Sequence, residues 1–326
     1  MPQPPIDLLV TDVQPLTDRI REFTLAAADG SPLPAPPPGA HLRLHAGDAG
    51  SGPLVRHYSI VGEDIDGDGP SPRRWRIAVQ REDHGGASAW IHDHAAPGTR
   101  LRAAGPAQAF ALDPRDTHTL LVAGGIGITP IVAMLRSLVR RRRSVAVAYT
   151  GGTRQAMAYH DEVRRLAGGR ALLHYSGGGQ RLDLAALLAG QPPDTTAYVC
   201  GPPGLVAAAH ATARALGWAA DRVRSESFAG QPRAGDAAFD VELRRSRRVL
   251  RVGAHASVLD TLLVAGVVDV LWDCRRGECG LCATDIVAAD GPIEHRDRCL
   301  DAAQQRGGAM CICVSRTTGT RLVLDA

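Results

Sequence analysis

The sequence predicts a multidomain protein in which an antiparallel β-barrel is followed by an α/β domain with a parallel sheet and by a small α+β domain. Three observations predict this fold class. The first third of the chain consists of short alternating apolar runs broken by turns, without a long helical period. The middle third alternates continuous apolar runs with helical patterns, as parallel sheets do. The last third carries a hairpin pattern, one helix and a cysteine-rich loop.

The 326 residues suffice for two or three domains. We expect domains at residues 1–114, 115–229 and 239–326. The segment from Gly230 to Asp236 is rich in glycine and proline and predicts a linker, which we place at residues 230–238.

In the first domain, residues 20–25 and 41–44 alternate between apolar and polar side chains, as half-buried strands do. A proline-rich loop at residues 32–39 separates them. Many short strands of this kind predict an antiparallel barrel.

Two segments of this domain carry polar residues that suit a ligand. One is the strand segment Arg56-His57-Tyr58-Ser59, and the other is residues 78–82 with the turn Gly85-Gly86-Ala87-Ser88. A glycine turn that enters a helix presents backbone N–H groups, which favour a phosphate together with the helix dipole. A nearby arginine would add a bidentate contact. The alternative is a surface turn in which a serine caps a helix.

Together these segments resemble the flavin domain of the ferredoxin reductase superfamily, whose strand motif is Arg-x-Tyr-Ser/Thr. The resemblance implies that Arg56 binds the flavin phosphate, that Tyr58 lies along the isoalloxazine ring and that Ser59 lies near its N5 edge. It implies FMN as the flavin. The further flavin-site residues that it implies are His57, Val79, Gly85, Gly86, Ala87 and Ser88. We expect His92 and His94 to be ordinary surface histidines.

The second domain opens with the apolar run at residues 119–123, a glycine turn at residues 124–127 and a helical pattern. Strand, glycine turn and helix in this order make a dinucleotide site plausible, because the backbone can approach a pyrophosphate at the helix N-terminus. Pro130 stands where a strict fingerprint has its third glycine. The segment instead resembles the Gly-Gly-x-Gly-x-Thr-Pro motif of the NAD(P)-binding half of the same superfamily. The resemblance implies a nucleotide site at Gly125, Gly127, Thr129 and Pro130.

Further strands are expected at residues 144–149, 171–174 and 197–199, and the last of these runs into Cys200-Gly201-Pro202. Alone, Cys200 would be a buried thiol at a strand end. The superfamily has a Cys-Gly-Pro turn whose cysteine lies against the nicotinamide, and an aromatic residue at the end of this domain that covers the flavin or the nicotinamide. The resemblance therefore implies nicotinamide contacts from Cys200, Gly201 and Pro202, and a gate at Phe228.

The second nucleotide-binding strand ends at Thr150-Gly151-Gly152-Thr153-Arg154, without the acidic residue that favours NAD or a clear 2′-phosphate site. Arg154 is compatible with either nucleotide, and the branch that the chain resembles uses NADH. The run Arg140-Arg141-Arg142-Arg143 fits a solvated helix end, with partner docking as the alternative.

The third domain contains Cys274, Cys279 and Cys282, with four and then two residues between them, and the distant Cys311 and Cys313. This C-x4-C-x2-C…C spacing is that of a plant-type [2Fe–2S] cluster, in which a tight loop supplies three thiolates and a distant segment supplies the fourth. A four-cysteine zinc site is the alternative, but zinc ribbons usually carry two cysteine pairs. Cys311 and Cys313 are two apart and would share a face of a strand, so spacing does not choose between them.

The loop resembles that of plant-type ferredoxins, and so does the β-grasp order of a hairpin, a helix capped by Ser257 and the cysteine loop. In that family the last ligand stands in a Cys-Val-Ser-Arg-like context, here Cys313-Val314-Ser315-Arg316. The resemblance implies Cys274, Cys279, Cys282 and Cys313 as the cluster ligands, and Cys311 as a bystander.

The composition argues against two kinds of partner. The formal net charge of +3 does not indicate a nucleic-acid-binding surface. No apolar run approaches the roughly 18–20 residues that cross a bilayer, and the segment Met1-Pro2-Gln3-Pro4-Pro5 does not resemble a secretory signal. Seven cysteines, four of them assigned to a cluster, indicate a reducing compartment. We therefore expect a cytoplasmic protein without a membrane or nucleic-acid partner.

The order of flavin, nicotinamide and ferredoxin domains resembles the phthalate dioxygenase reductase family, to which vanillate O-demethylase reductases belong. The resemblance implies electron transfer from NADH through FMN and a [2Fe–2S] cluster to a terminal oxygenase with a Rieske centre. Ser59, Cys200 and Phe228 would surround the hydride transfer. The alternatives are a reductase of a cytochrome P450 or another monooxygenase, and a redox sensor in which the cluster is a signal.

Overall fold

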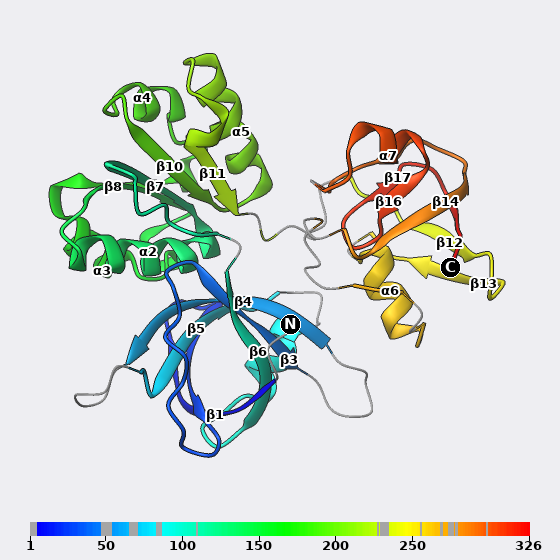
Figure 1. The fold of residues 1–326 in the computed structure, drawn as a ribbon, viewed down its shortest axis with the longest axis horizontal. Helices are drawn as coiled ribbons and strands as arrows, with labels where there is room; N and C mark the ends of the chain where they lie inside the picture. Colours follow the sequence, from blue (N-terminus) through cyan, green and yellow to red (C-terminus); the bar gives the residue numbers. More distant parts are fainter. Residues whose placement is uncertain are drawn as a thin grey trace. The chain divides into compact units, whose positions relative to one another are not determined.

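The computed structural model describes residues 5–46, 54–64, 71–82, 87–108, 110–226, 228, 235–254, 256–267, 270–272, 277, 280–297 and 299–326. They divide into two compact units, of which the first contains a barrel and a parallel sheet and the second contains a C-terminal mixed sheet. The predicted fold class is confirmed (Figure 1). The predicted domain limits stay a prediction, and most of the predicted linker lies outside the described residues.

Six antiparallel strands close the barrel in the order β1-β2-β5-β4-β3-β6. Phe23, Leu25, Trp75 and Ile77 are fully buried in its core, as the alternation of β2 and β5 requires. The Trp75 indole donates to the carbonyl of Pro34 at 3.0 Å, which ties the proline-rich loop to the core. The elements of this part are β1 (Ile6–Pro15), β2 (Ile20–Ala27), β3 (Ala40–Ala46), β4 (Leu54–Asp64), β5 (Arg74–Gln80), α1 (Ala87–His94) and β6 (Arg100–Gln108).

The parallel sheet has the strand order β11-β10-β7-β8-β9, and all its pairs are parallel. Helices α2 and α3 cover one face, and α4 and α5 cover the other (Figure 1). The strands are β7 (His118–Gly124), β8 (Ser144–Gly151), β9 (Ala171–Tyr175), β10 (Thr195–Cys200) and β11 (Val223–Glu226). The helices are α2 (Ile128–Arg140), α3 (His160–Ala167), α4 (Leu184–Ala189) and α5 (Pro203–Ala215). The strand order reverses between β7 and β10, and open sheets of this kind bind ligands at the carboxyl ends of such strands.

The barrel and the sheet are joined by polar contacts within the first unit. Arg136 of α2 donates to the carbonyl of Val61 in β4, and its guanidinium also binds both carboxylate oxygens of Glu162 in α3 at 2.7 Å. The Tyr159 hydroxyl donates to Oε2 of the buried Glu22 in β2 at 2.6 Å. Burial raises the pKa of Tyr159, so its hydroxyl keeps the proton that it donates. These contacts fix α2 and α3 against the barrel wall.

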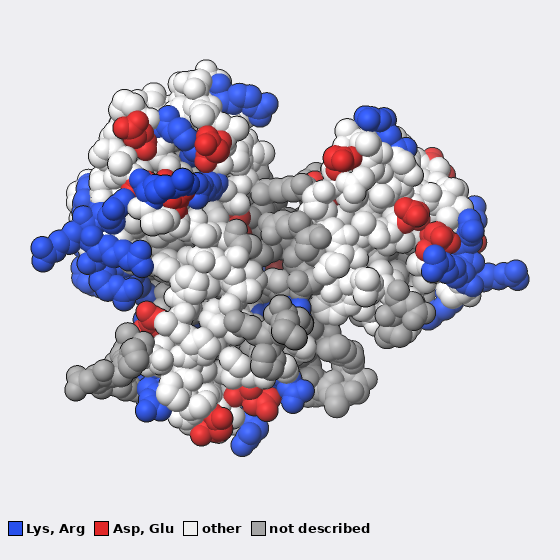
Figure 2. Space-filling view, viewed as in Figure 1, with Lys and Arg blue, Asp and Glu red and all other residues white. Residues whose placement is uncertain are grey.

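The arginine run at the end of α2 is exposed, and arginine side chains gather on the surface over α2 and α3 (Figure 2). Two of its members nevertheless have structural contacts. Arg140 lies 3.8 Å from Glu63, and Arg143 donates to the carbonyls of Pro114 and Asp116. The run therefore also ties α2 to β4 and to the segment before β7.

The second unit is a mixed sheet in the order β13-β12-β18-β14-β16, in which the pair β12 and β18 is parallel. Ser257 accepts from the N–H of Asp260 at 3.0 Å and caps α6 as predicted. The elements are β12 (Phe239–Leu243), β13 (Arg248–Val252), α6 (Val258–Val264), β14 (Ala283–Ala289), β15 (Ile293–Glu294), α7 (Ala302–Arg306), β16 (Ala309–Cys311), β17 (Arg316–Thr317) and β18 (Arg321–Leu324).

A buried arginine holds the core of this unit together. The Arg316 guanidinium donates to the carbonyls of Ala237, Gly253 and Ala256 at 2.5–3.1 Å and lies 5.0 Å from the ring centroid of Phe239. One arginine thereby satisfies three backbone acceptors that precede β12 or follow β13.

Among the described residues, no helix combines the length and apolar character that a membrane span requires.

We predict that replacing Arg316 by leucine lowers the free energy of unfolding of the second unit by roughly 3 kcal/mol, because three backbone carbonyls lose the donor that the buried Arg316 side chain provides. Hydrogen exchange of the full-length protein measures this, and the amides of β12 and β18 should exchange faster. Arg321→Leu is the control, because Arg321 forms an exposed ion pair with Glu242 and its loss should change exchange little. Equal protection in Arg316→Leu and the unsubstituted chain would contradict the prediction.

Candidate functional site

The turn after β7 and the turn after β10 touch through their backbones at the point where the strand order reverses. A Cβ on Gly127 would lie 2.4 Å from the carbonyl oxygen of Cys200, and a Cβ on Gly201 would lie 3.0 Å from the Cα of Gly124. Only glycine fits at Gly127 without moving the second turn. Gly125 has φ +54, which glycine adopts without strain. The turn from Gly124 to Gly127 and the turn that begins at Cys200 are therefore packed against each other, and we call this pair the double turn.

A 3-10 turn over Gly125–Gly127 leads directly into α2 beside this double turn, and the N–H of Ile128 donates to the carbonyls of Gly125 and Ile126. Gly127 forms the N-cap without a side-chain cap, and the helix continues for 13 residues. The buried Thr129 hydroxyl donates to the carbonyl of Ile126 at 3.0 Å and holds the turn shape, while the buried Pro130 lacks an N–H to satisfy. The first N–H groups of this helical segment, which begins at Gly125, and the helix dipole make this a suitable place for an anion.

Cys200 and Glu226 lie beside each other at the ends of neighbouring strands. Cys200 is fully buried, and the strand register pairs it with Ala123 of β7 and with Glu226 of β11. Glu226 is 2% exposed. The sequence analysis missed Glu226, although a carboxylate at the carboxyl end of a parallel strand, two residues before the predicted gate, was a usable signal. Phe228 is half-buried and belongs to the second compact unit, so its predicted role as a gate stays a prediction.

The segment predicted to bind a flavin forms part of β4 and carries two buried hydroxyl groups. The Tyr58 hydroxyl and the Ser59 hydroxyl have no hydrogen-bond partner among the described residues. Burial raises the pKa of Tyr58, so that it stays a neutral donor. A buried hydroxyl without a partner costs about 1–3 kcal/mol, and such groups are rare unless a ligand or water satisfies them. The two hydroxyls therefore fit a bound group that has polar atoms.

The surroundings of these hydroxyls come from β3, β5 and α1. The rings of His41 and His57 stack at 4.7 Å, and Val79 is fully buried. Ala87 begins α1 and is buried, and Ser88 accepts from the N–H of Glu82 at 3.2 Å, which ties the helix start to the end of β5. Arg56 lies on β4, while Gly85 and Gly86 lie outside the described residues.

The expectation of a surface position is wrong for His92. Its ring is 7% exposed, shares a hydrogen bond of 2.9 Å with the carbonyl of Val79 and lies edge-on to Phe23. Burial lowers the pKa of His92, so the neutral ring serves as a core residue that fixes α1 on β5. His94 is exposed and stacks on Trp90 at 5.0 Å.

Three cysteines of the predicted cluster region are described and buried: Cys282, Cys311 and Cys313. The thiols of Cys311 and Cys313 are hydrogen-bonded to Cys282 and hold its pKa far below the ordinary value, which favours the thiolate that a metal ligand needs. The same contact raises the pKa of Cys311, which keeps its proton. Cys274 and Cys279 lie outside the described residues.

Cys311 and Cys313 do not share a strand face, contrary to the expectation. Cys311 ends β16, and Cys313 lies in the following turn, in which Ser315 N–H donates to the carbonyl of Cys311 at 2.9 Å. Cys311 Sγ lies 3.4 Å from Cys299 Sγ, so these two non-ligand candidates form a pair.

The glycines of the loop also suit a close-fitting ligand. Gly277 has φ +69, and a Cβ there would lie 2.8 Å from the Cα of Asp297. Gly280 has φ +74. Both positions therefore favour glycine, and a Cβ on Gly280 would lie 3.8 Å from Cys299 Sγ.

A cavity of about 410 Å³ lies at the carboxyl ends of β8 and β9, next along the sheet from the turn after β7. Arg154 lines it, and its role in nucleotide binding stays a prediction. Tyr175 also lines this cavity, and the sequence alone did not single it out. Its hydroxyl is hydrogen-bonded to His160, which lies 15 residues earlier in the chain.

Comparison with known proteins agrees with this arrangement. The chain matches the 2Fe-2S iron-sulfur cluster binding domain over residues 241–318 and the oxidoreductase NAD-binding domain over residues 121–176. It is 38% identical to the heme-dependent oxidative N-demethylase beta subunit of Ectopseudomonas mendocina (strain ymp), and the match covers 98% of each chain. It is 35% identical to the carnitine monooxygenase reductase subunit of Escherichia coli (strain K12), again over 98% of each chain.

Among solved structures, it resembles phthalate dioxygenase reductase with a TM-score of 0.78 and 29% identity, over 99% of this chain and 98% of that one. The agreement extends over all parts of the fold. The chain belongs to the phthalate dioxygenase reductase family of oxygenase reductase components, with a nicotinamide-nucleotide-binding domain and a [2Fe–2S] domain.

Proposed function

We propose that the chain carries electrons from NADH through FMN and a [2Fe–2S] cluster to a terminal oxygenase. The observation that carries this proposal is that one compact unit contains both the double turn at Gly127 and Cys200 and the buried hydroxyls of Tyr58 and Ser59. The double turn would bind the nucleotide and the two hydroxyls would face a polar cofactor, and both belong to the same compact unit. A bound flavin would supply the exchange between two-electron and one-electron chemistry, and the protein binds and orients the carriers.

In the nucleotide site, the N–H groups of the turn from Gly125 to Gly127, which leads into α2, would receive the pyrophosphate. The residues from Thr129 to Pro130 hold that turn. Cys200, Gly201 and Pro202 form the surface against which the nicotinamide lies, with Glu226 at the neighbouring strand end. Phe228 serves as the gate between the nicotinamide and the flavin.

In the flavin site, Arg56 and the turn Gly85-Gly86-Ala87-Ser88 bind the phosphate of FMN. Tyr58 lies along the ring, and the Ser59 hydroxyl donates toward its N5 edge. His57 and Val79 complete the contacts. The hydroxyls of Tyr58 and Ser59 would then gain the partners that they lack among the described residues.

The cluster is held by Cys274, Cys279, Cys282 and Cys313, and the burial of Cys282 and Cys313 in one core supports their part in this set. Cys311 stays outside the ligand set, because Cys313 and not Cys311 stands in the Cys-Val-Ser-Arg context of plant-type ferredoxins. We place the protein in the cytoplasm, where thiols stay reduced.

We propose a Rieske non-haem iron oxygenase as the partner. The name of one relative, a heme-dependent demethylase subunit, favours a haem-containing partner as the second candidate. Reconstitution with an oxygenase encoded beside this chain distinguishes them, because the iron centre of the oxygenase that turns over with NADH identifies the partner class.

Steady-state electron transfer tests the proposed function. The purified holoprotein should reduce cytochrome c with NADH, because single electrons leave through the cluster. A protein that binds FMN and the cluster but transfers no electrons from NADH to cytochrome c would contradict the proposal and favour a redox sensor.

We predict that Gly127→Ala slows NADH-dependent flavin reduction by roughly tenfold, which corresponds to about 1.4 kcal/mol. The added Cβ cannot fit 2.4 Å from the Cys200 carbonyl, so the two turns must separate. Stopped-flow absorbance measures the rate. Gly204→Ala is the matched control, because a Cβ there meets no atom within 4 Å. Equal rates in the two variants would refute the prediction.

We predict that Ser59→Ala also slows flavin reduction by roughly tenfold, because one hydrogen bond worth about 1 kcal/mol or slightly more is lost at the reacting edge. Ser137→Ala removes another buried serine hydroxyl without a partner among the described residues and should leave the rate unchanged. A normal rate with Ser59→Ala would remove Ser59 from the site.

We predict that Cys313→Ser abolishes the cluster signal and keeps NADH-dependent flavin reduction, while Cys311→Ser keeps both. The reason is that only the Cys313 thiolate completes the ligand set. Visible absorbance and low-temperature EPR of the two purified variants measure the cluster. The opposite pattern would reverse the assignment.

A further inference from the structure

Hydrogen bonds join the loop after β8 to the loop after β9 at the cavity that these two loops line. The N–H of Gly177 donates to the carbonyl of Gly152 at 2.8 Å, and the Ser176 hydroxyl donates to the carbonyl of Gly151 at 3.1 Å. A Cβ on Gly177 would lie 2.7 Å from the carbonyl oxygen of Gly152. The residues lining the cavity are Gly152, Thr153, Arg154, Tyr175, Gly177 and Gly178. These loops follow the strands next to the pyrophosphate turn, where the adenosine of a dinucleotide lies.

Arg154 is the one cationic side chain among these lining residues, and its charge is paired. Nη2 of Arg154 lies 2.9 Å from Oδ1 and 3.2 Å from Oδ2 of Asp161, in the first turn of α3. Dinucleotide sites of this fold recognise a ribose 2′-hydroxyl through a carboxylate, and a 2′-phosphate through an arginine. Here the carboxylate of Asp161, at the start of α3, is paired directly with the guanidinium of Arg154.

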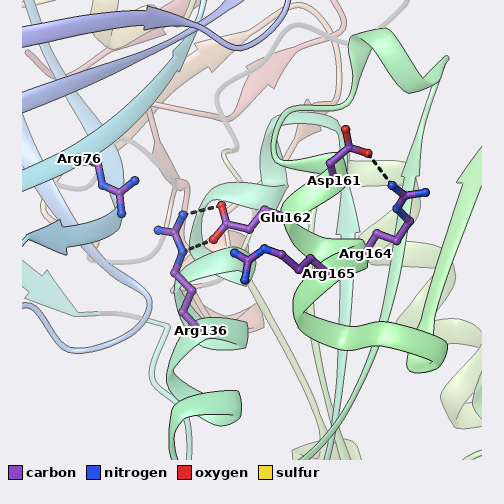
Figure 3. A pocket seen from close by; sticks show the side chains of 6 residues that line it. All are labelled: Arg76, Arg136, Asp161, Glu162, Arg164 and Arg165. Atoms are coloured by element: carbon purple, nitrogen blue, oxygen red, sulfur yellow. Dashed lines mark hydrogen bonds and ion pairs between the residues drawn. The ribbon is translucent and has the colours of Figure 1, made fainter.

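Asp161 is held in this position from several sides. Nδ1 of the buried His160 lies 2.9 Å from Asp161 Oδ1, and its Nε2 lies 2.8 Å from the Tyr175 hydroxyl. Arg164 approaches the same carboxylate at 3.7 Å. In Figure 3 Asp161 faces Arg164, at the edge of a second cavity of about 700 Å³. The hydrogen bond from His160, and then the neighbouring arginines, lower the pKa of Asp161, so it is a carboxylate at neutral pH.

We propose that Asp161 determines the preference of this reductase for NADH over NADPH. The carboxylate neutralises Arg154, so the cavity offers a paired charge that accepts a ribose 2′-hydroxyl. It repels a 2′-phosphate, which would bring further negative charge against Asp161. Removing the carboxylate would leave Arg154 as a cation on this cavity without its partner Asp161, the kind of group that binds a 2′-phosphate.

This inference rests on the proposed function, and one set of kinetic measurements separates the two. The values of kcat/KM for NADH and for NADPH are measured with cytochrome c as the acceptor for the unsubstituted holoprotein and for Asp161→Asn. We expect the NADPH value to rise at least tenfold in Asp161→Asn, while the NADH value changes less than about threefold.

Two further variants control for a purely structural effect. Asp161→Asn combined with Arg154→Gln should lose the gain with NADPH, because the released arginine is then missing. Asp7→Asn, which breaks an exposed pair with Arg102 on the barrel, should leave both values unchanged. Inhibition by adenosine 2′-monophosphate provides a second readout, and it should become at least tenfold stronger in Asp161→Asn and not in the double variant.

An unchanged ratio of the two kcat/KM values in Asp161→Asn would overturn the inference, and so would an equal loss with both nucleotides, which a structural role alone predicts. If neither nucleotide supports reduction in the unsubstituted holoprotein, the proposed function itself fails.

Discussion

The contact between the turn after β7 and the turn after β10 is the constraint on which the rest of the site depends. Glycine at residue 127 lets the first turn approach the Cys200 carbonyl to a distance that no other residue permits. This contact sets the start of α2 and the end of β10 at the reversal of strand order, where ligands bind in open sheets. We propose that the nucleotide binds at this contact, so that close backbone packing would define its site and the side chains around it would add charge and selectivity.

The second requirement is a fixed relation between this double turn and the barrel. Arg136 and Tyr159 provide it, because they connect α2 and the start of α3 to β4 and β2 through Val61 and Glu22. Hydride transfer needs donor and acceptor within about 3–3.5 Å, so the two sites must not drift. The cluster domain has a different requirement. Its buried arginine and thiols organise a separate unit that needs only to pass single electrons onward.

Short motifs were predictable from the sequence, because each uses neighbouring residues whose spacing has one structural purpose. The turn from Gly124 to Pro130 and the alternating strands of the barrel are of this kind. Contacts between distant residues were not predictable. His92 is hydrogen-bonded to Val79 of β5, and Glu226 lies beside Cys200, because helices and strands bring these residues together. The relation between Cys311 and Cys313 was also not predictable. The strand ends at Cys311, and the turn that follows removes the alternation expected of a strand.

An anaerobic titration of the holoprotein with NADH, followed by absorbance and by low-temperature EPR, tests the central claim most directly. The account predicts that the flavin absorbance bleaches and that the rhombic EPR signal of a reduced [2Fe–2S] cluster appears in the same titration. A flavin that is bleached by a chemical reductant and not by NADH would contradict the nucleotide site built on Gly127 and Cys200. A flavin that bleaches without a cluster signal would contradict electron transfer to the second unit.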